Sequence, residues 1–590
     1  MMSHHTTATP EQRRIRRDTG IIITLCLISL FMFLGITDFN TRGEPREALV
    51  ALAMLKDGNW TLPLTNGVDI AYKPPLFHWC IALVSMIFGG VTEFTSRFPS
   101  AVALTAMAVA GYRFFAHRVG PTVSLLATLV MLTSFEVHRA GINCRVDMLL
   151  TAMIVCSLYA LYVWAYEKGM RGIPWIGILC LSGAFLTKGP VGVVLPCMVV
   201  AVMLWTRGRG FWPVVWRIAL VAVAACLLPA VWYYAAWKQG GQQFLDLVMM
   251  ENVLRFLGKM NYASHENPWW YNVVTMVSGL LPWTLLLLFS LFALRYKRPE
   301  LSPSILWKRL KRSVATMDDA RLFALLSAVL IFVFYCIPKS KRSVYLLPVY
   351  PFAAYFIAEY VLWLARNHKR VISSYGTVIA CLAFIMTAAG VAAITGLIPD
   401  TIFQGRHAAQ NAAFLHAFEH TPSLWQAVVL ALPAMASVIY LGGRKLLADG
   451  KVRAFAIALL TVSMFFCLDG FYLPRILGVQ SDRSVAREVE RIVPKGPIYS
   501  YITLTAADNR MHPFTINFYT GGRVKPFADF KPTAGHVLIG PREIDIFKKN
   551  YGNSYELKLV YDSHHRSCDN HDDVVLYEFK RHITKQASTK

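Results

Sequence analysis

Residues 372–397 read ISSYGTVIACLAFIMTAAGVAAITGL and contain no charged side chain. An apolar helix of about 20 residues is long enough to cross the hydrocarbon core of a bilayer. Runs of this kind recur through the first 472 residues. The candidates are 20–37, 76–90, 97–116, 121–137, 147–166, 173–187, 189–206, 213–236, 270–294, 320–338, 343–365, 372–397, 424–442 and 453–472. The sequence therefore predicts a polytopic α-helical membrane protein.

The composition agrees with this class. Hydrophobic residues make up 55% of the 590 positions and charged residues only 16%, whereas soluble domains have about 25% charged residues. The net charge of +24 would suit a nucleic-acid partner in a soluble chain. Here Lys and Arg lie mostly in short loops between apolar runs, as the positive-inside rule predicts. The composition thus excludes a soluble enzyme and argues against nucleic-acid binding.

The same rule selects the spans. If all the candidate runs crossed the membrane, basic loops such as 207–209 and 295–321 would lie outside. Leaving out 76–90, a short run directly after Lys73-Pro74-Pro75, returns these loops to the cytoplasm. We therefore expect about 13 transmembrane helices with a cytoplasmic N-terminus, and a helix at 76–90 in the outer interface.

This topology divides the chain into three parts. Residues 1–19 form a cytoplasmic tail, 20–472 a transmembrane domain with long external loops 38–96 and 237–269, and 473–590 an external domain. Each long loop has helical apolar spacing, so we expect surface helices at 45–55 and 242–258. In the last part we expect a small α/β domain. Its predicted elements are a helix at 484–493 and strands at 497–502, 514–520, 536–540, 555–561 and 573–579.

The external segments carry cations that the positive-inside rule does not explain. They include Arg42, Arg46, Lys73, Arg139, Arg145, Lys188, Arg255, Lys259, Lys339, Lys341 and Arg342. A lipid-linked phosphate on the external face would bind such residues. The alternative for each one is contact with ordinary lipid head groups at a helix end.

Three titratable residues on the same face are candidates for chemistry. Glu44 is either a general base beside a phosphate-binding arginine or a first-turn carboxylate that complements a helix dipole. Asp147 has the same two interpretations at the start of run 147–166. His265, close to Trp269, is either a metal or acceptor ligand or a member of an interfacial aromatic belt.

Several motifs in residues 20–350 resemble one known family. They are Gly43-Glu44-Pro45-Arg46-Glu47-Ala48, Asp57-Gly58-Asn59-Trp60, Asn66-Gly67, Tyr72-Lys73-Pro74-Pro75-Leu76-Phe77-His78-Trp79, Arg145-Val146-Asp147-Met148-Leu149-Leu150, Leu186-Thr187-Lys188-Gly189-Pro190-Val191, Glu251-Asn252, Arg255-Phe256, His265, Pro268-Trp269, Pro282-Trp283, Ser340-Lys341 and Tyr345-Leu346-Leu347-Pro348. They are similar to those of the bacterial GT-C glycosyltransferases of the protein O-mannosyltransferase and 4-amino-4-deoxy-L-arabinose (lipid A) transferase type, which are glycosyltransferase family 39-like.

The resemblance implies site residues. The family has an Asp-Glu pair two positions before an Arg, and this chain has Gly43 at the Asp position. The resemblance then implies Glu44 as the base, with Asp147 as a second candidate, or a replacement by Asp38 or Glu47. It implies that the donor phosphate is bound by Arg46, Lys73, Arg255, Lys341 and Tyr345. His265 is the candidate for an acceptor or a metal.

The resemblance also implies an activity, namely inverting transfer of a sugar from a polyprenyl-phosphate carrier to a lipid (lipid A-like) or protein acceptor. The reaction would take place on the periplasmic face of the bacterial inner membrane. No cofactor is required, and a divalent metal is left open because Tyr72 stands where the family often has an acid. The alternatives are a flippase or transporter of lipid-linked sugars, which would place polar residues along its spans, and a glycan ligase.

Overall fold

The structure is a computed structural model that describes residues 9–71, 73–257, 259, 266–294, 302–405, 408–443, 447–502 and 513–582. The first half of the bundle contains α1 (Pro10–Cys26), η1 (Leu27–Phe31), α2 (Gly43–Asp57), β1 (Leu64–Thr65), β2 (Asp69–Ile70), α3 (Leu76–Phe88), α4 (Glu93–Val119), α5 (Pro121–Leu132), α6 (Phe135–Gly141), α7 (Val146–Tyr162), η2 (Val163–Glu167), α8 (Trp175–Lys188), α9 (Val191–Thr206), α10 (Phe211–Met249), η3 (Met250–Leu254) and α11 (Arg255–Leu257).

The second half contains α12 (Tyr271–Gly279), α13 (Trp283–Ala293), α14 (Pro303–Ala315), α15 (Asp319–Cys336), η4 (Ser343–Val349), α16 (Tyr350–Asn367), α17 (Lys369–Ile394), η5 (Asp400–Ile402), α18 (Ala408–His416), α19 (Leu424–Gly442), α20 (Gly450–Cys467), η6 (Leu468–Tyr472) and α21 (Leu473–Gln480). Every predicted span falls on a helix or a helix pair. Among the described residues, 8 helices could cross a membrane by length and composition, or up to 10 if each bent pair is one span. This is fewer than the predicted 13, partly because α8 and α9 are short.

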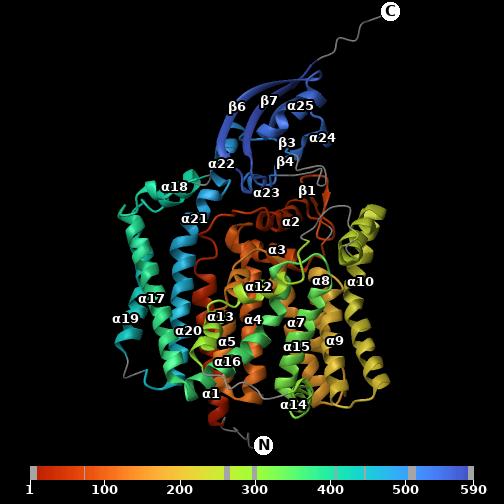
Figure 1. The fold of residues 1–590 in the computed structure, drawn as a ribbon. Helices are drawn as coiled ribbons and strands as arrows, with labels where there is room; N and C mark the ends of the chain where they lie inside the picture. Colours follow the sequence, from red (N-terminus) through yellow and green to blue (C-terminus); the bar gives the residue numbers. More distant parts are fainter. Residues whose placement is uncertain are drawn as a thin grey trace, which may run out of the picture.

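The two ends of the bundle differ. Figure 1 shows the N-terminal end of α1 and the basic helix α14 at the lower end, and the C-terminal domain at the upper end beside α2. The predicted topology requires this arrangement, because it places the N-terminus and the loop 295–321 on one face and the last 118 residues on the other. The upper end is therefore the one at which we look for the site.

The helix α2 corrects one prediction. We expected a surface helix at 45–55, but most of α2 is buried, including Glu44, Glu47 and Ala48. The C-terminal domain covers it, because α23 (Phe514–Tyr519) packs on α2 and the Lys56 ammonium donates a hydrogen bond to the Gly521 carbonyl oxygen. A helix that looked amphipathic in the sequence is thus buried by a domain far along the chain.

The other two predicted helices of the external loops are present. The helix α3 packs against α2 and α4 and leaves Ile87 78% exposed, so its place in the interface stays a prediction. The expected helix at 242–258 is the upper part of α10 with η3 and α11. It is separated from the lower part of α10 by a break at Gly241, whose φ is 55°.

The C-terminal domain is α/β, as predicted, but one of the predicted strands is a helix. Its elements are α22 (Arg483–Ile492), β3 (Ile498–Ser500), α23, β4 (Val524–Pro526), α24 (Phe527–Phe530), β5 (Ala534–Ile539), η7 (Pro541–Glu543), α25 (Ile544–Tyr551), β6 (Tyr555–Arg566) and β7 (Asp573–Arg581). The sheet order is β4-β3-β5-β7-β6, parallel from β4 to β5 and antiparallel beyond.

The predicted strand at 514–520 is wrong, since this segment is the helix α23. Its start is held by Asp569, whose carboxylate accepts hydrogen bonds from the Thr515 amide at 2.7 Å and from the Thr515 hydroxyl at 3.0 Å. A carboxylate in this position stabilises the first turn of a helix. The tertiary contact therefore outweighs the strand propensity of the sequence.

The domain is fastened to the first external loop. The Phe39 amide donates to the Tyr519 hydroxyl at 2.9 Å, and this hydroxyl donates to Glu93 at 2.8 Å. The Ser481 hydroxyl donates to the Phe39 carbonyl at 2.6 Å, and Arg483 pairs with Asp38. These contacts hold the domain over α2.

Candidate functional site

The structure contains a cavity of about 1150 Å³. Among the elements that line it, α2 and α21 lie at the upper end of the bundle, next to the C-terminal domain (Figure 1). Its walls come from η1, α2, the β1–β2 hairpin, α6, η6 and α21, and Phe514 contributes from the C-terminal domain. The cavity therefore joins the first external loop to a part of the chain more than 400 residues away. It contains both charged and apolar walls, which suits a ligand with a charged head and an apolar remainder.

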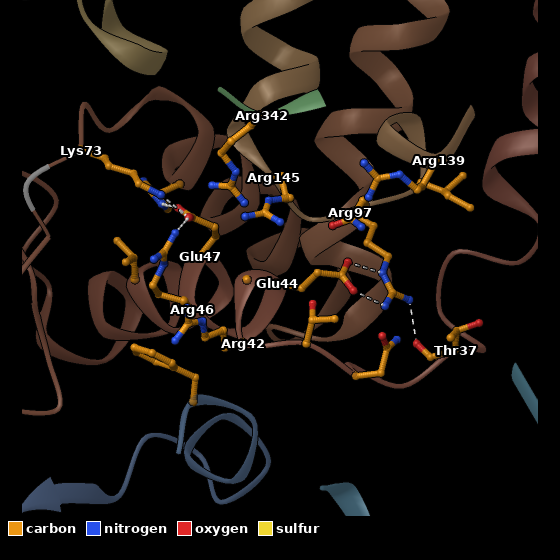
Figure 2. A pocket seen from close by; sticks show the side chains of 18 of the residues that line it. Thr37, Arg42, Glu44, Arg46, Glu47, Lys73, Arg97, Arg139, Arg145 and Arg342 are labelled. Carbon is orange, nitrogen blue, oxygen red and sulfur yellow. Dashed lines mark hydrogen bonds and ion pairs between the residues drawn. The ribbon is translucent and has the colours of Figure 1, made fainter. Parts of the chain in front are cut away.

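Glu44 lines this cavity and accepts three hydrogen bonds, two of them from Arg97 (Figure 2). Its two carboxylate oxygens accept hydrogen bonds from Arg97 Nε at 2.8 Å and Arg97 Nη2 at 2.9 Å, and the Cys144 amide donates to Oε1 at 2.8 Å. Both Glu44 and Arg97 are buried. The carboxylate thus fixes the start of α2 against α4 and the Cys144 loop, and its role as a base stays a prediction.

The position of the missing acid is taken by an arginine. A Cβ atom on Gly43 would lie 3.0 Å from Arg145 Nη1 and 3.1 Å from its Cζ. The absence of a side chain at Gly43 therefore allows the Arg145 guanidinium to lie against the first turn of α2. A guanidinium thus lies at the position where the family that this chain resembles has a carboxylate.

Glu47 is the centre of a second charged group. It forms ion pairs with Lys73 and, at 3.1 Å, with Arg46, and His78 Nε2 lies 2.9 Å from its other oxygen. Burial alone would raise the pKa of Glu47, but Lys73, Arg46 and His78 outweigh it and hold this pKa well below its usual range. Burial, aided by Arg46, lowers the pKa of Lys73 to about 8. Glu47 therefore stays ionised and organises the cations around it.

Two further arginines face the same cavity without a carboxylate. Figure 2 shows the guanidinium groups of Arg145 and Arg342 close to one another, between the Glu47 group and the Glu44 group. Within the described ranges, no acidic residue forms an ion pair with either of them. Burial lowers the pKa of Arg342, and Arg145 lowers it further. Half-buried cations that repel one another are stabilised by an anion between them.

The other predicted residues are distributed as follows. Arg255 lines the cavity and pairs with Glu251 at 2.6 Å. Asp147 is outside the cavity lining and pairs with Lys188, whose ammonium lies 4.2 Å from the ring centroid of Tyr345.

Lys341 is buried and points to backbone. Its ammonium donates to the carbonyl oxygens of Pro338 at 2.7 Å and Asn267 at 3.2 Å. Its neighbour Arg342 is the residue of this segment that lines the cavity. His265 lies outside the described residues.

Sequence reasoning missed three groups of this site. Arg97 stands at the start of the apolar run 97–116, so the sequence predicts it to be part of a span. His138 and Asp469 also line the cavity and lie 2.6 Å apart, although 331 residues separate them. An aspartate inside the apolar run 453–472 was a usable signal, because a charged residue in a span is costly and often functional.

Comparison with known proteins agrees with this architecture. The family described as dolichyl-phosphate-mannose-protein mannosyltransferase matches residues 72–234. A Shewanella sediminis protein named undecaprenyl phosphate-alpha-4-amino-4-deoxy-L-arabinose arabinosyl transferase is 24% identical over 392 residues, covering 63% of this chain and 65% of its own length. A Proteus mirabilis protein of the same name, numbered 2, is 28% identical and covers 59% and 60%.

The matches thus span less than two thirds of these relatives. Among solved structures, the crystal structure of ArnT from Cupriavidus metallidurans bound to undecaprenyl phosphate superimposes with a TM-score of 0.67 at 18% identity, covering 94% of this chain and 97% of that one. This chain is a polytopic membrane protein with the GT-C fold of that transferase, and it resembles the arabinosyl transferases in sequence.

Proposed function

We propose that the protein is an integral membrane glycosyltransferase that moves a sugar from a polyprenyl-phosphate carrier to a lipid or protein acceptor. The observation that carries the proposal is the group of cations in the cavity. Arg145 and Arg342 face it without a carboxylate partner among the described residues, and Lys73 and Arg46 stand beside them around Glu47. A phosphate diester is an anion of the size and charge that such a group binds.

The same cations suit the chemistry. When the bond between the sugar and the carrier breaks, the leaving polyprenyl phosphate gains a negative charge. Positively charged groups already in place stabilise that charge more in the transition state than in the ground state. Arg46, Lys73, Arg145, Arg255 and Arg342 can do this, and attack by the acceptor from the opposite side gives inversion at the sugar. Lys341 and Tyr345 would act only after a rearrangement that brings them to the cavity.

The same arrangement supports a location for the reaction. The cavity is at the end of the bundle that holds the C-terminal domain, which is the face that we assign to the periplasm of a bacterial inner membrane. A carrier lipid would reach it from the bilayer. Its sugar would meet acceptors below the C-terminal domain.

The test is release of free polyprenyl phosphate. The purified protein in nanodiscs would be given undecaprenyl-phosphate sugars, including the 4-amino-4-deoxy-L-arabinose derivative, together with total envelope extract as the source of acceptors. We expect release by the wild type and a loss of at least about tenfold in Lys73→Ala. The control is Lys168→Ala, an exposed lysine that follows η2 and does not line the cavity. No release with any donor, while the protein still binds or moves the lipid, would replace this proposal with a flippase.

A further inference from the structure

A buried histidine–aspartate pair lies in the wall of the cavity. His138 Nε2 is 2.6 Å from Asp469 Oδ2, and the side chains are only 6% and 7% exposed. The His138 ring stacks on Phe465, with ring centroids 4.5 Å apart and planes inclined by 19°. Resting on the function proposed above, we propose that His138, oriented by Asp469, is the general base that takes the proton of an acceptor hydroxyl.

Both residues stand on interrupted helices. His138 is on α6, which follows α5 after a bend of 70°. Asp469 is on the π-helical turn η6, between α20 and α21. Single π-helical turns inside helices weaken the regular hydrogen-bond ladder and are often found at functional sites. The two breaks bring the imidazole and the carboxylate together in the cavity wall.

The hydrogen bond to Asp469 fixes the state of the imidazole. A carboxylate that accepts the Nε2 proton holds the tautomer in which Nδ1 carries the lone pair. The serine hydrolases use the same principle with the two ring nitrogens exchanged. Within the described residues no group hydrogen-bonds to His138 Nδ1, and His138 lines the cavity. His78 is different, because its Nδ1 is buried and its Nε2 is used by Glu47.

Two carboxylates of the cavity wall, Glu44 and Glu47, are already held by cations. Glu44 has both oxygens hydrogen-bonded to Arg97. Glu47 is held by Lys73 and Arg46, and its pKa lies well below the usual range, so it holds a proton weakly. Gly43 has no side chain to offer. His138 offers an imidazole to the cavity, and imidazole is the side chain that enzymes use most often for proton transfer.

The step balances without another reactant. His138 Nδ1 takes the proton of the acceptor hydroxyl, and the hydroxyl oxygen forms a bond to the anomeric carbon of the sugar. The bond between that carbon and the phosphate oxygen breaks, and its electron pair leaves with the polyprenyl phosphate. The imidazolium that results is stabilised by Asp469. An acceptor phosphate is already ionised at neutral pH and needs no base, so this assignment specifies a hydroxyl acceptor.

The test compares His138→Gln and Asp469→Asn with a control, His117→Gln. His117 is an exposed histidine in the last turn of α4 and does not line the cavity. Transfer would be measured by release of polyprenyl phosphate in the nanodisc assay, and donor binding separately with undecaprenyl phosphate. We expect His138→Gln to slow transfer at least about a hundredfold, the low end for a positioned base, with donor binding within about twofold of the wild type. His117→Gln should match the wild type in both.

Asp469→Asn adds a readout that a structural role would not change. Without the carboxylate the imidazole is no longer held in the tautomer that offers Nδ1, so kcat should drop while the KM for the donor stays within about twofold of the wild type. Arg139 and Glu136, the charged neighbours on α6, pair with each other at 2.7 Å and are unchanged in this variant.

Three results would overturn the assignment. They are a His138→Gln variant that transfers at a rate near that of the wild type, an Asp469→Asn variant whose kcat matches that of the wild type, and a product whose sugar is released by mild acid, as from a glycosyl phosphate. Wild-type release of polyprenyl phosphate, sensitive to Lys73→Ala, establishes the transferase separately. If transfer is established in this way and one of the three results is found, only the assignments of His138 as the base and of a hydroxyl acceptor are wrong.

Discussion

Replacing Glu44 with glutamine is expected to destabilise the protein by about 3–5 kcal/mol, the usual cost of removing one partner of a buried ion pair. Glutamine offers one acceptor oxygen where the carboxylate accepts from Arg97 Nε, Arg97 Nη2 and the Cys144 amide at 2.8, 2.9 and 2.8 Å. Its amide group would oppose an N–H donor of Arg97. The buried guanidinium would also lose its counter-charge. The total loss of stability corresponds to a decrease of roughly 100-fold or more in the folding equilibrium constant.

The assay is the free energy of unfolding in mixed detergent micelles, measured for Glu44→Gln, Arg97→Gln and the double variant. The double variant should lose less than the sum of the two single variants, because it removes both charges together. The control is Glu167→Gln, which breaks the more exposed pair with Arg118 and should cost less than about 1 kcal/mol. A Glu44→Gln variant with wild-type stability and no transfer would refute this reasoning and support the base role predicted from the sequence.

Three more predictions concern the cavity and the domain above it. The pKa of Lys73, lowered to about 8, means that its charge is lost as the pH rises through 8. Undecaprenyl phosphate should therefore bind more weakly from pH 8 to 9 in the wild type but not in Lys73→Arg, and equal pH dependences would contradict this. Gly43→Ala should displace Arg145 and weaken that binding several-fold, whereas Gly20→Ala, with open space around it, should not. Arg483→Ala, which breaks the ion pair with Asp38, should speed limited proteolysis next to the C-terminal domain, and an unchanged cleavage rate would show that this pair does not hold the domain.

The helices of the bundle could be predicted because their signal is local. An apolar run such as 372–397 must form a helix in a bilayer, since its backbone groups find no other partners there. The segment 514–520 could not be predicted in this way. Its apolar and aromatic residues suit a strand, and its helix depends on Asp569, which is distant in the sequence.

The site was predicted in its charge but not in its pairing. Arg46, Lys73 and Arg255 line the cavity. The sequence singles them out because cations on the outer face are exceptions to the positive-inside rule. The partner of each charge is determined by the tertiary structure. The sequence does not reveal that Arg97 forms an ion pair with Glu44. In the same way, the pair of His138 and Asp469 joins two segments that carry no common motif.

The contacts between the C-terminal domain and the first external loop have a consequence for chimeric proteins. Asn517 and Asn66, 451 positions apart, share a hydrogen bond at 2.5 Å, and Lys56 reaches Gly521 in the same seam. A graft that moves residues 473–590 alone into a relative would leave these partners behind. Exchanging substrate preference between relatives by recombination should therefore succeed only when residues 38–96 travel with the domain.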